Sequence, residues 1–190
     1  MKKTSTKTVV FTAIMTSLIV LLQFMGSFIK FGPFSISLVL IPIVIGTAMC
    51  GTGAGAWLGL VFGLMVLISG DAAAFLAINV PGTIITVLLK GIACGLVAGI
   101  VYKWLSKKNR YLAVAGAAVA CPIVNTGIFL LGCLVFFMDT ITGWATAAGL
   151  GANVAQYMIF GLVGWNFLFE LGLNIILSPV IVRLLNIKNY

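Results

Sequence analysis

The chain has 190 residues, of which 62% are apolar and 7% are charged, and its mean hydropathy is +1.25. A soluble domain carries roughly 25% charged residues, so 11 Lys and Arg with 3 Asp and Glu cannot cover a water-facing surface. The composition excludes a soluble enzyme, a disordered chain and a disulfide-stapled secreted module, and it indicates an integral membrane protein. The net charge of +8 does not indicate nucleic-acid binding, because the basic residues stand at the ends of apolar runs.

Six apolar runs follow one another along the chain, and a transmembrane helix needs about 20 mostly apolar residues. The second run is short, and the last two are long enough to tilt. The alternation of polar and apolar residues that is typical of a membrane barrel is absent. The sequence therefore predicts an all-α membrane protein, with residues 1–190 forming a single integral membrane domain that is a bundle of six transmembrane helices. The predicted spans are residues 8–29, 35–50, 53–69, 81–102, 111–138 and 154–185.

Most of the 11 basic residues lie before the first span, between the fourth and fifth spans, and after the sixth. With six spans, these three places share one side of the membrane, and the positive-inside rule makes that side, with both termini, cytoplasmic. Lys2 and Lys3 precede an apolar run, but the run is too long for a signal peptide and no cleavage site follows it.

Glycines recur every four residues in the third and fourth spans, a spacing that lets two helix backbones approach closely. The two rows are Gly51, Gly55, Gly59 and Gly63, and Gly91, Gly95 and Gly99. Packing inside the bundle is one interpretation of these rows, and docking of a partner helix is the other.

Polar groups within lipid are costly and mark functional sites by default. Lys90 lies near the middle of the fourth span, where its ammonium either extends toward the cytoplasmic edge or meets a carboxylate, a ligand anion or water. Asn166, Glu170 and Asn174 follow one another at i, i+4 and i+8, and so share one face of the sixth span.

The polar and aromatic residues of the spans gather in the second half of the chain, toward its predicted outer side. They predict the wall of an outward-facing pocket for a small polar molecule, since such a pocket combines aromatic surface with a few fixed polar groups. For any one of them, an interhelical hydrogen bond is the alternative role. The candidate substrate-binding residues are Asn79, Lys90, Asn125, Trp144, Asn153, Gln156, Trp165, Asn166 and Glu170.

Nothing in the sequence indicates catalysis. The chain has no histidine, and Cys50, Cys94, Cys121 and Cys133 stand singly, so we expect neither a metal site nor a nucleophile–base pair. No phosphate-binding Gly-x-x-x-x-Gly-Lys-Ser/Thr loop is present, so this chain does not hydrolyse ATP by that route and we expect no cofactor in it.

Three local runs carry a resemblance to a known family, and their order and spacing extend it over nearly the whole chain. They are Asn79-Val-Pro81 leading to Leu89-Lys90-Gly91, the run Pro122-Ile-Val-Asn125-Thr126, and Asn166-x-x-x-Glu170 with Ser178-Pro179 after it. With the six short-looped spans and the basic loop before the fifth, the sequence resembles the S component of an energy-coupling factor (ECF) vitamin importer. The similarity is to its pantothenate-like and riboflavin-like branches.

The resemblance implies a multi-pass protein of the bacterial cytoplasmic membrane that captures a vitamin from outside and has no transport power of its own. It implies a membrane coupling subunit and two cytoplasmic ATPase subunits as partners, which use ATP, and no nucleic acid. The family contacts its coupling subunit through an Ala-x-x-x-Ala face on the first span, here Ala13 and Ser17. The resemblance also implies that the protein topples in the membrane to carry the site from outside to inside, with the outer connection around Lys30–Phe34 as a gate.

The substrate follows from one departure from the family's pattern. A resemblance to riboflavin-type members would imply an Asn-x-x-Lys pattern in the sixth span. This chain has Asn166 and Glu170 there instead, and no lysine. We therefore expect pantothenate first and riboflavin second, with Lys90 as the cation for the pantothenate carboxylate. A self-sufficient secondary transporter of a small organic solute is the alternative function, although its usual pair of related halves is not visible here. A membrane enzyme is a third and weaker alternative.

Overall fold

Helices make up nearly all of the backbone in this computed structural model, which describes residues 5–28, 30–31, 34–35, 38–150 and 153–187. The predicted all-α class is confirmed, apart from a small antiparallel hairpin of two-residue strands. The elements are α1 (Thr6–Ser27), β1 (Lys30–Phe31), β2 (Phe34–Ser35), α2 (Leu40–Cys50), α3 (Thr52–Ile68), α4 (Ala73–Leu76), α5 (Val80–Leu105), α6 (Arg110–Phe136), α7 (Met138–Ala147), α8 (Val154–Gln156), the π-helical segment η1 (Tyr157–Val163) and α9 (Gly164–Ile187).

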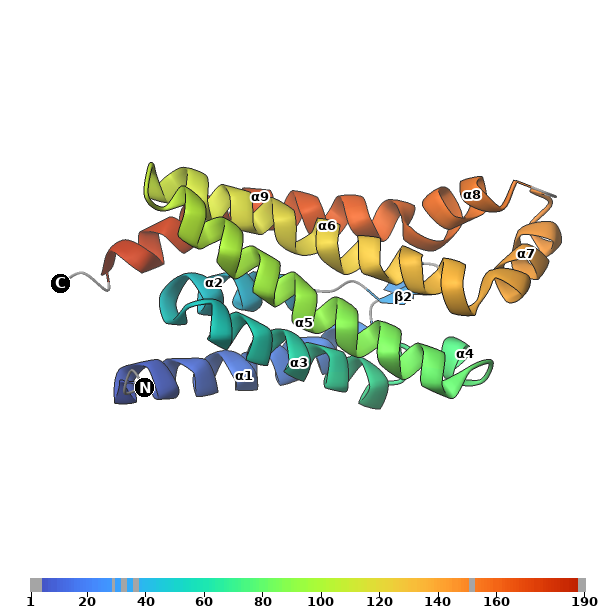
Figure 1. The fold of residues 1–190 in the computed structure, drawn as a ribbon, viewed down its shortest axis with the longest axis horizontal. Helices are drawn as coiled ribbons and strands as arrows, with labels where there is room; N and C mark the ends of the chain where they lie inside the picture. Colours follow the sequence, from blue (N-terminus) through green and yellow to red (C-terminus); the bar gives the residue numbers. More distant parts are fainter. Residues whose placement is uncertain (1–4, 29, 32–33, 36–37, 151–152, 188–190) are drawn as a thin grey trace.

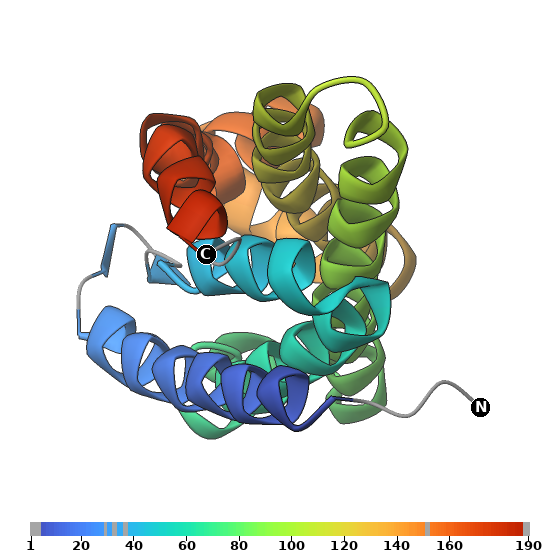
Figure 2. The ribbon, with the colours of Figure 1, turned by 90° about the vertical axis from the view of Figure 1, so that its left-hand side faces the viewer.

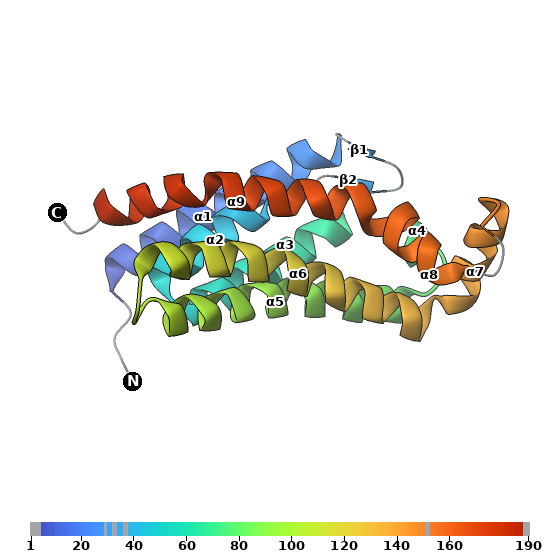
Figure 3. The ribbon, with the colours of Figure 1, turned by 90° about the horizontal axis from the view of Figure 1, so that it is seen from above.

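The long helices lie side by side along one axis of the molecule (Figure 1). The largest interfaces join α3 to α5, α5 to α6, and α6 to α9. The start of α1, the end of α9 and the α5–α6 connection lie at one end of the bundle, and α4 and α7 lie at the other (Figures 1 and 3). Figure 2 looks along the bundle from the first of these ends and shows α1 on the side away from α6, with α2 between them.

Some of the predicted spans correspond to helices long enough to cross a membrane, and others correspond to shorter helices. Within the described residues, α1, α5, α6 and the stretch Asn166–Arg183 of α9 are long and apolar enough to cross a membrane. In contrast, α2 and α3 have 11 and 17 residues. The second span was predicted to begin at residue 35, but residues 34–35 belong to strand β2, and the helix begins only at Leu40.

The glycine rows hold α3 and α5 together. A methyl group added at Gly59 would lie 2.0 Å from the carbonyl oxygen of Gly91, and one added at Gly55 would lie 2.6 Å from that of Gly95. Because lipid offers no hydrophobic drive for helix association, such backbone contact supplies the van der Waals attraction. This supports packing inside the bundle rather than docking of a partner. Gly51 is not part of the row, because its φ of +93° makes it the turn between α2 and α3.

The last predicted span, residues 154–185, is not one continuous α-helix. It begins as α8, widens into the π-helical segment η1, and continues as α9. A π-helical stretch adds residues to each turn, changes the direction of the side chains that follow, and is frequent at functional sites. The short helices α4 and α7, which the apolar runs did not predict, lie at the same end of the bundle as η1 (Figure 1).

Candidate functional site

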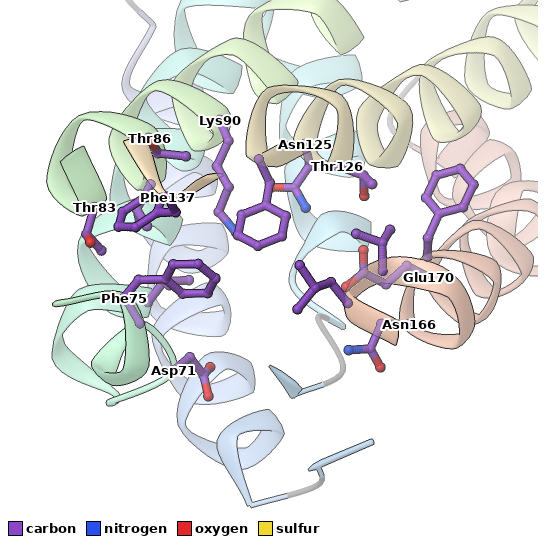
Figure 4. Close-up of a pocket in the computed structure, with 17 residues that line it drawn as sticks. Asp71, Phe75, Thr83, Thr86, Lys90, Asn125, Thr126, Phe137, Asn166 and Glu170 are labelled. Atoms are coloured by element: carbon purple, nitrogen blue, oxygen red, sulfur yellow. The ribbon is translucent and has the colours of Figure 1, made fainter. Parts of the chain in front are cut away.

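A cavity lies among α5, α6, η1, α9 and the connection from α3 to α4, in the half of the bundle nearer to α4 and α7 (Figure 4). Its volume is about 90 Å³. The apolar wall consists of Val66, Ala72, Phe75, Val87, Phe129, Phe137, Leu162, Val163 and Phe167. The polar wall consists of Asp71, Thr83, Thr86, Lys90, Asn125, Thr126, Asn166 and Glu170.

Lys90 extends from α5 into this cavity (Figure 4). Its Nζ lies 5.6 Å from the ring centroid of Phe62 and 5.5 Å from that of Phe129, distances at which the faces of aromatic rings attract a cation. Glu170 and Asp71 are the acidic side chains that line the same cavity. The ammonium is therefore directed at the cavity.

Two further helices bring amides and a carboxylate to the wall of the cavity. Asn125 comes from α6, next to Thr126, and Asn166 and Glu170 come one turn apart from α9. The Oδ1 atoms of Asn125 and Asn166 are buried and have no hydrogen-bond partner among the described residues. A buried acceptor without a partner is unfavourable, so these positions suit a ligand that brings O–H or N–H donors.

Aromatic side chains form the wall of the cavity near α4 and α7. The ring of Phe75 makes edge contacts with those of Phe129, Phe137 and Trp144, with centroid distances of 5.6, 4.9 and 5.7 Å. Pairs in this geometry stabilise beyond their buried area. Trp144 thus lies behind Phe75 and outside the lining set, so it supports the wall without being part of it.

The structure brings together Lys90, Asn125, Asn166 and Glu170 of the predicted set and places others elsewhere. The Oδ1 of Asn79 accepts a hydrogen bond of 3.0 Å from the backbone N–H of Gly82, and so caps α5. Asn153 and Gln156 are exposed and hydrogen-bonded to each other over 3.1 Å. Trp165 lies in α9, but its side chain is outside the described residues.

Sequence reasoning missed several lining residues, and for some of them a signal exists. Thr83, Thr86 and Lys90 are spaced i, i+3 and i+7, so they share one face of α5. That signal is ambiguous, because a threonine hydroxyl in a helix can bond back to its own backbone, as Thr83 does to the carbonyl of Asn79 over 2.7 Å. Asp71 lies between helices, where no periodicity applies.

The face of small residues on α1 that was predicted to contact a partner subunit is exposed. Ala13 and Ser17 are both exposed on α1, whereas Met15 and Ile19 of the same helix are buried. For a metal, the part of the chain that the structure describes offers no group of three or more Cys, Asp or Glu side chains.

Comparison with known proteins defines the class of protein that carries this site. Residues 7–182 match the family described as ECF transporter, substrate-specific component, and the chain belongs to that family. It is therefore a multi-pass membrane protein and a component of a transporter. The chain is also 29% identical over 199 residues to the pantothenic acid transporter PanT of Lactococcus lactis subsp. cremoris (strain MG1363), an alignment covering 96% of this chain and 95% of the relative. No solved structure matches the chain.

Proposed function

We propose that this chain captures pantothenate, or a vitamin precursor of the same chemistry, for ATP-driven uptake by partner subunits. One observation carries the proposal: the ammonium of Lys90 shares a cavity with the unpartnered amide oxygens of Asn125 and Asn166 among the described residues. Pantothenate brings one carboxylate for the cation, and hydroxyl and amide donors for the oxygens. The name of the relative PanT agrees with this assignment. Riboflavin, which has no carboxylate, ranks second.

The experiment is a ligand panel on the purified chain. We expect pantothenate to raise the midpoint of thermal unfolding and to bind in a titration, because a ligand of the native state stabilises it by mass action. Panthenol, in which an alcohol replaces the carboxylate, should bind ~10- to 100-fold more weakly, the range expected for losing a charged hydrogen bond. Equal binding of both ligands, or preference for riboflavin, would remove the basis for assigning the carboxylate to Lys90.

For the topology, we propose six spans with both termini in the cytoplasm and the cavity toward the outer side, within one membrane domain of residues 1–190. The grouping of the start of α1, the end of α9 and the α5–α6 connection at one end supports it (Figure 1), together with the basic residues there. A Ser106→Cys variant in a Cys50→Ala background tests it. We expect an impermeant thiol reagent to label this cysteine only after the cells are opened. Labelling from outside would reverse the orientation.

For the partners, we propose that Ala13 and Ser17 contact a membrane coupling subunit, which in turn joins two cytoplasmic ATPases that use ATP. The exposure of both residues on α1 supports this role. The gate predicted at Lys30–Phe34 includes residues 32–33, which lie outside the described residues, and it stays a prediction.

A further inference from the structure

One polar side chain of helix α1, that of Gln23, is buried inside the bundle. Gln23 is 2% exposed and lies on the inner face of α1 with Met15, Ile19 and Gly26. The Nε2 of Gln23 donates hydrogen bonds to the Oδ2 of Asp71 and, over 3.3 Å, to the Oγ of Ser69. Burying an amide is costly unless it is hydrogen-bonded, so its position is governed by this acceptor pair rather than by packing.

The carboxylate that Gln23 holds belongs to the cavity. Asp71 follows Gly70, whose φ of +86° turns the chain between α3 and α4, and it lines the wall at the edge facing away from Thr86 (Figure 4). Its Oδ2 also accepts a hydrogen bond of 3.3 Å from the Ser69 hydroxyl. Hydrogen bonds to a carboxylate are among the stronger kinds, and both of these draw Oδ2 toward α1 and its own turn.

The position of this carboxylate matters because Lys90 lines the same cavity as Asp71. Opposite charges attract strongly in a low-dielectric site, and the lysine stem is long and flexible. If Asp71 turned toward Lys90, the resulting internal ion pair would compete with any anion that enters the cavity.

We propose that Gln23 is a positioning residue that holds Asp71 away from Lys90 and so keeps the ammonium available to an anionic ligand. This inference rests on the proposed function for the choice of ligand. It assigns to α1, whose outer face carries Ala13 and Ser17, a role in the specificity of the cavity.

The test uses purified wild type, Gln23→Met, Asp71→Asn and the double variant. Methionine keeps the length of the side chain and removes the donor, and Met15→Leu on the same inner face is the matched control. We expect Gln23→Met to weaken pantothenate binding ~10-fold and panthenol binding less than ~3-fold, because only the carboxylate competes with Asp71. Asp71→Asn in the Gln23→Met background should restore pantothenate affinity, which a merely structural role of Gln23 would not produce. Unchanged binding in Gln23→Met, equal weakening of both ligands, or absence of rescue overturns the proposal.

A second measurement needs no ligand. The rate at which an amine reagent modifies Lys90, followed by mass spectrometry, should fall in Gln23→Met and recover in the double variant, because an ion pair with Asp71 would hold the amine away from the reagent. If wild type binds no pantothenate, the proposed function fails, while the labelling pattern still decides the role of Gln23: equal rates in all variants overturn it. Ser69→Ala, which removes the other donor to Asp71, should shift the rate in the same direction if Gln23→Met does not fold.

Discussion

The hydroxyl of Ser17 donates a hydrogen bond of 3.2 Å to the carbonyl oxygen of Ala13, one turn earlier on the exposed face of α1. The serine therefore satisfies its own polar group within the helix, and the face stays small and needs no polar partner. A small face is what a closely approaching helix of another membrane protein requires.

This relationship predicts different results for two substitutions at one position. Ser17→Ala should leave uptake by the complete transporter unchanged, because the face keeps its size. Ser17→Phe should reduce uptake ~10-fold or more by holding the partner helix away, while ligand binding by the isolated chain stays normal. Uptake of labelled pantothenate by cells, beside binding by purified protein, separates the two effects. Normal uptake by Ser17→Phe would show that this face does not dock.

The contact between α3 and α5 predicts a large effect of a single methyl group. Gly59→Ala should lower the free energy of unfolding by about 1–3 kcal/mol, since its Cβ would strike the Gly91 carbonyl 2.0 Å away. Gly53→Ala in the same helix, where a Cβ would meet nothing within 4 Å, is the matched control and should be neutral or stabilising. Thermal unfolding in one detergent compares them, and equal midpoints would contradict the interface.

The parts of the fold and of the candidate site that could be predicted from the sequence are those that depend on local patterns of residues. The apolar runs and the glycine period predicted the helices and their close packing because both are local patterns. Lys90, Asn125, Asn166 and Glu170 could be found because a polar group within an apolar run is conspicuous.

Three-dimensional placement accounts for what the sequence could not supply. In the sequence Asn79 cannot be distinguished from the polar residues that line the cavity, but in the structure it caps helix α5. Trp144 contacts the ring of Phe75, which lines the cavity, and does not line the cavity itself. Asp71 and Gln23 are 48 positions apart, and only folding makes them neighbours. The π-helical segment, too, leaves no recognisable period in its residues.

The charge in the cavity predicts a ligand-specific loss. Lys90→Met should weaken pantothenate binding ~10- to 100-fold and leave the weaker binding of panthenol nearly unchanged, because only the carboxylate needs the cation. Lys103→Met, the same change at an exposed position of α5, is the control and should bind like wild type. Calorimetric titration of both ligands provides the ratio. A uniform loss for the two ligands would indicate damage to the fold instead.

The unpartnered amide in the wall predicts opposite effects on stability and binding. Asn125→Leu should stabilise the ligand-free chain or leave it unchanged, because it removes a buried acceptor that has no partner among the described residues. The same change should weaken pantothenate binding ~10-fold by removing a contact to the ligand. Thr47→Val, which removes a similarly unpartnered hydroxyl of α2 away from the cavity, should match its stability effect without changing affinity. Destabilisation by Asn125→Leu with unchanged affinity would place that amide outside the ligand site.

The central claim, that this chain captures a vitamin but cannot move it alone, is tested most directly in vesicles that contain only this chain. The measurement is the amount of labelled pantothenate retained per protein molecule, with an imposed proton or sodium gradient and without one. We expect retention to saturate at about one molecule per chain and to be unaffected by the gradients, since a binding component saturates with its sites. Accumulation beyond that ratio, driven by a gradient, would contradict the account and identify a self-sufficient secondary transporter.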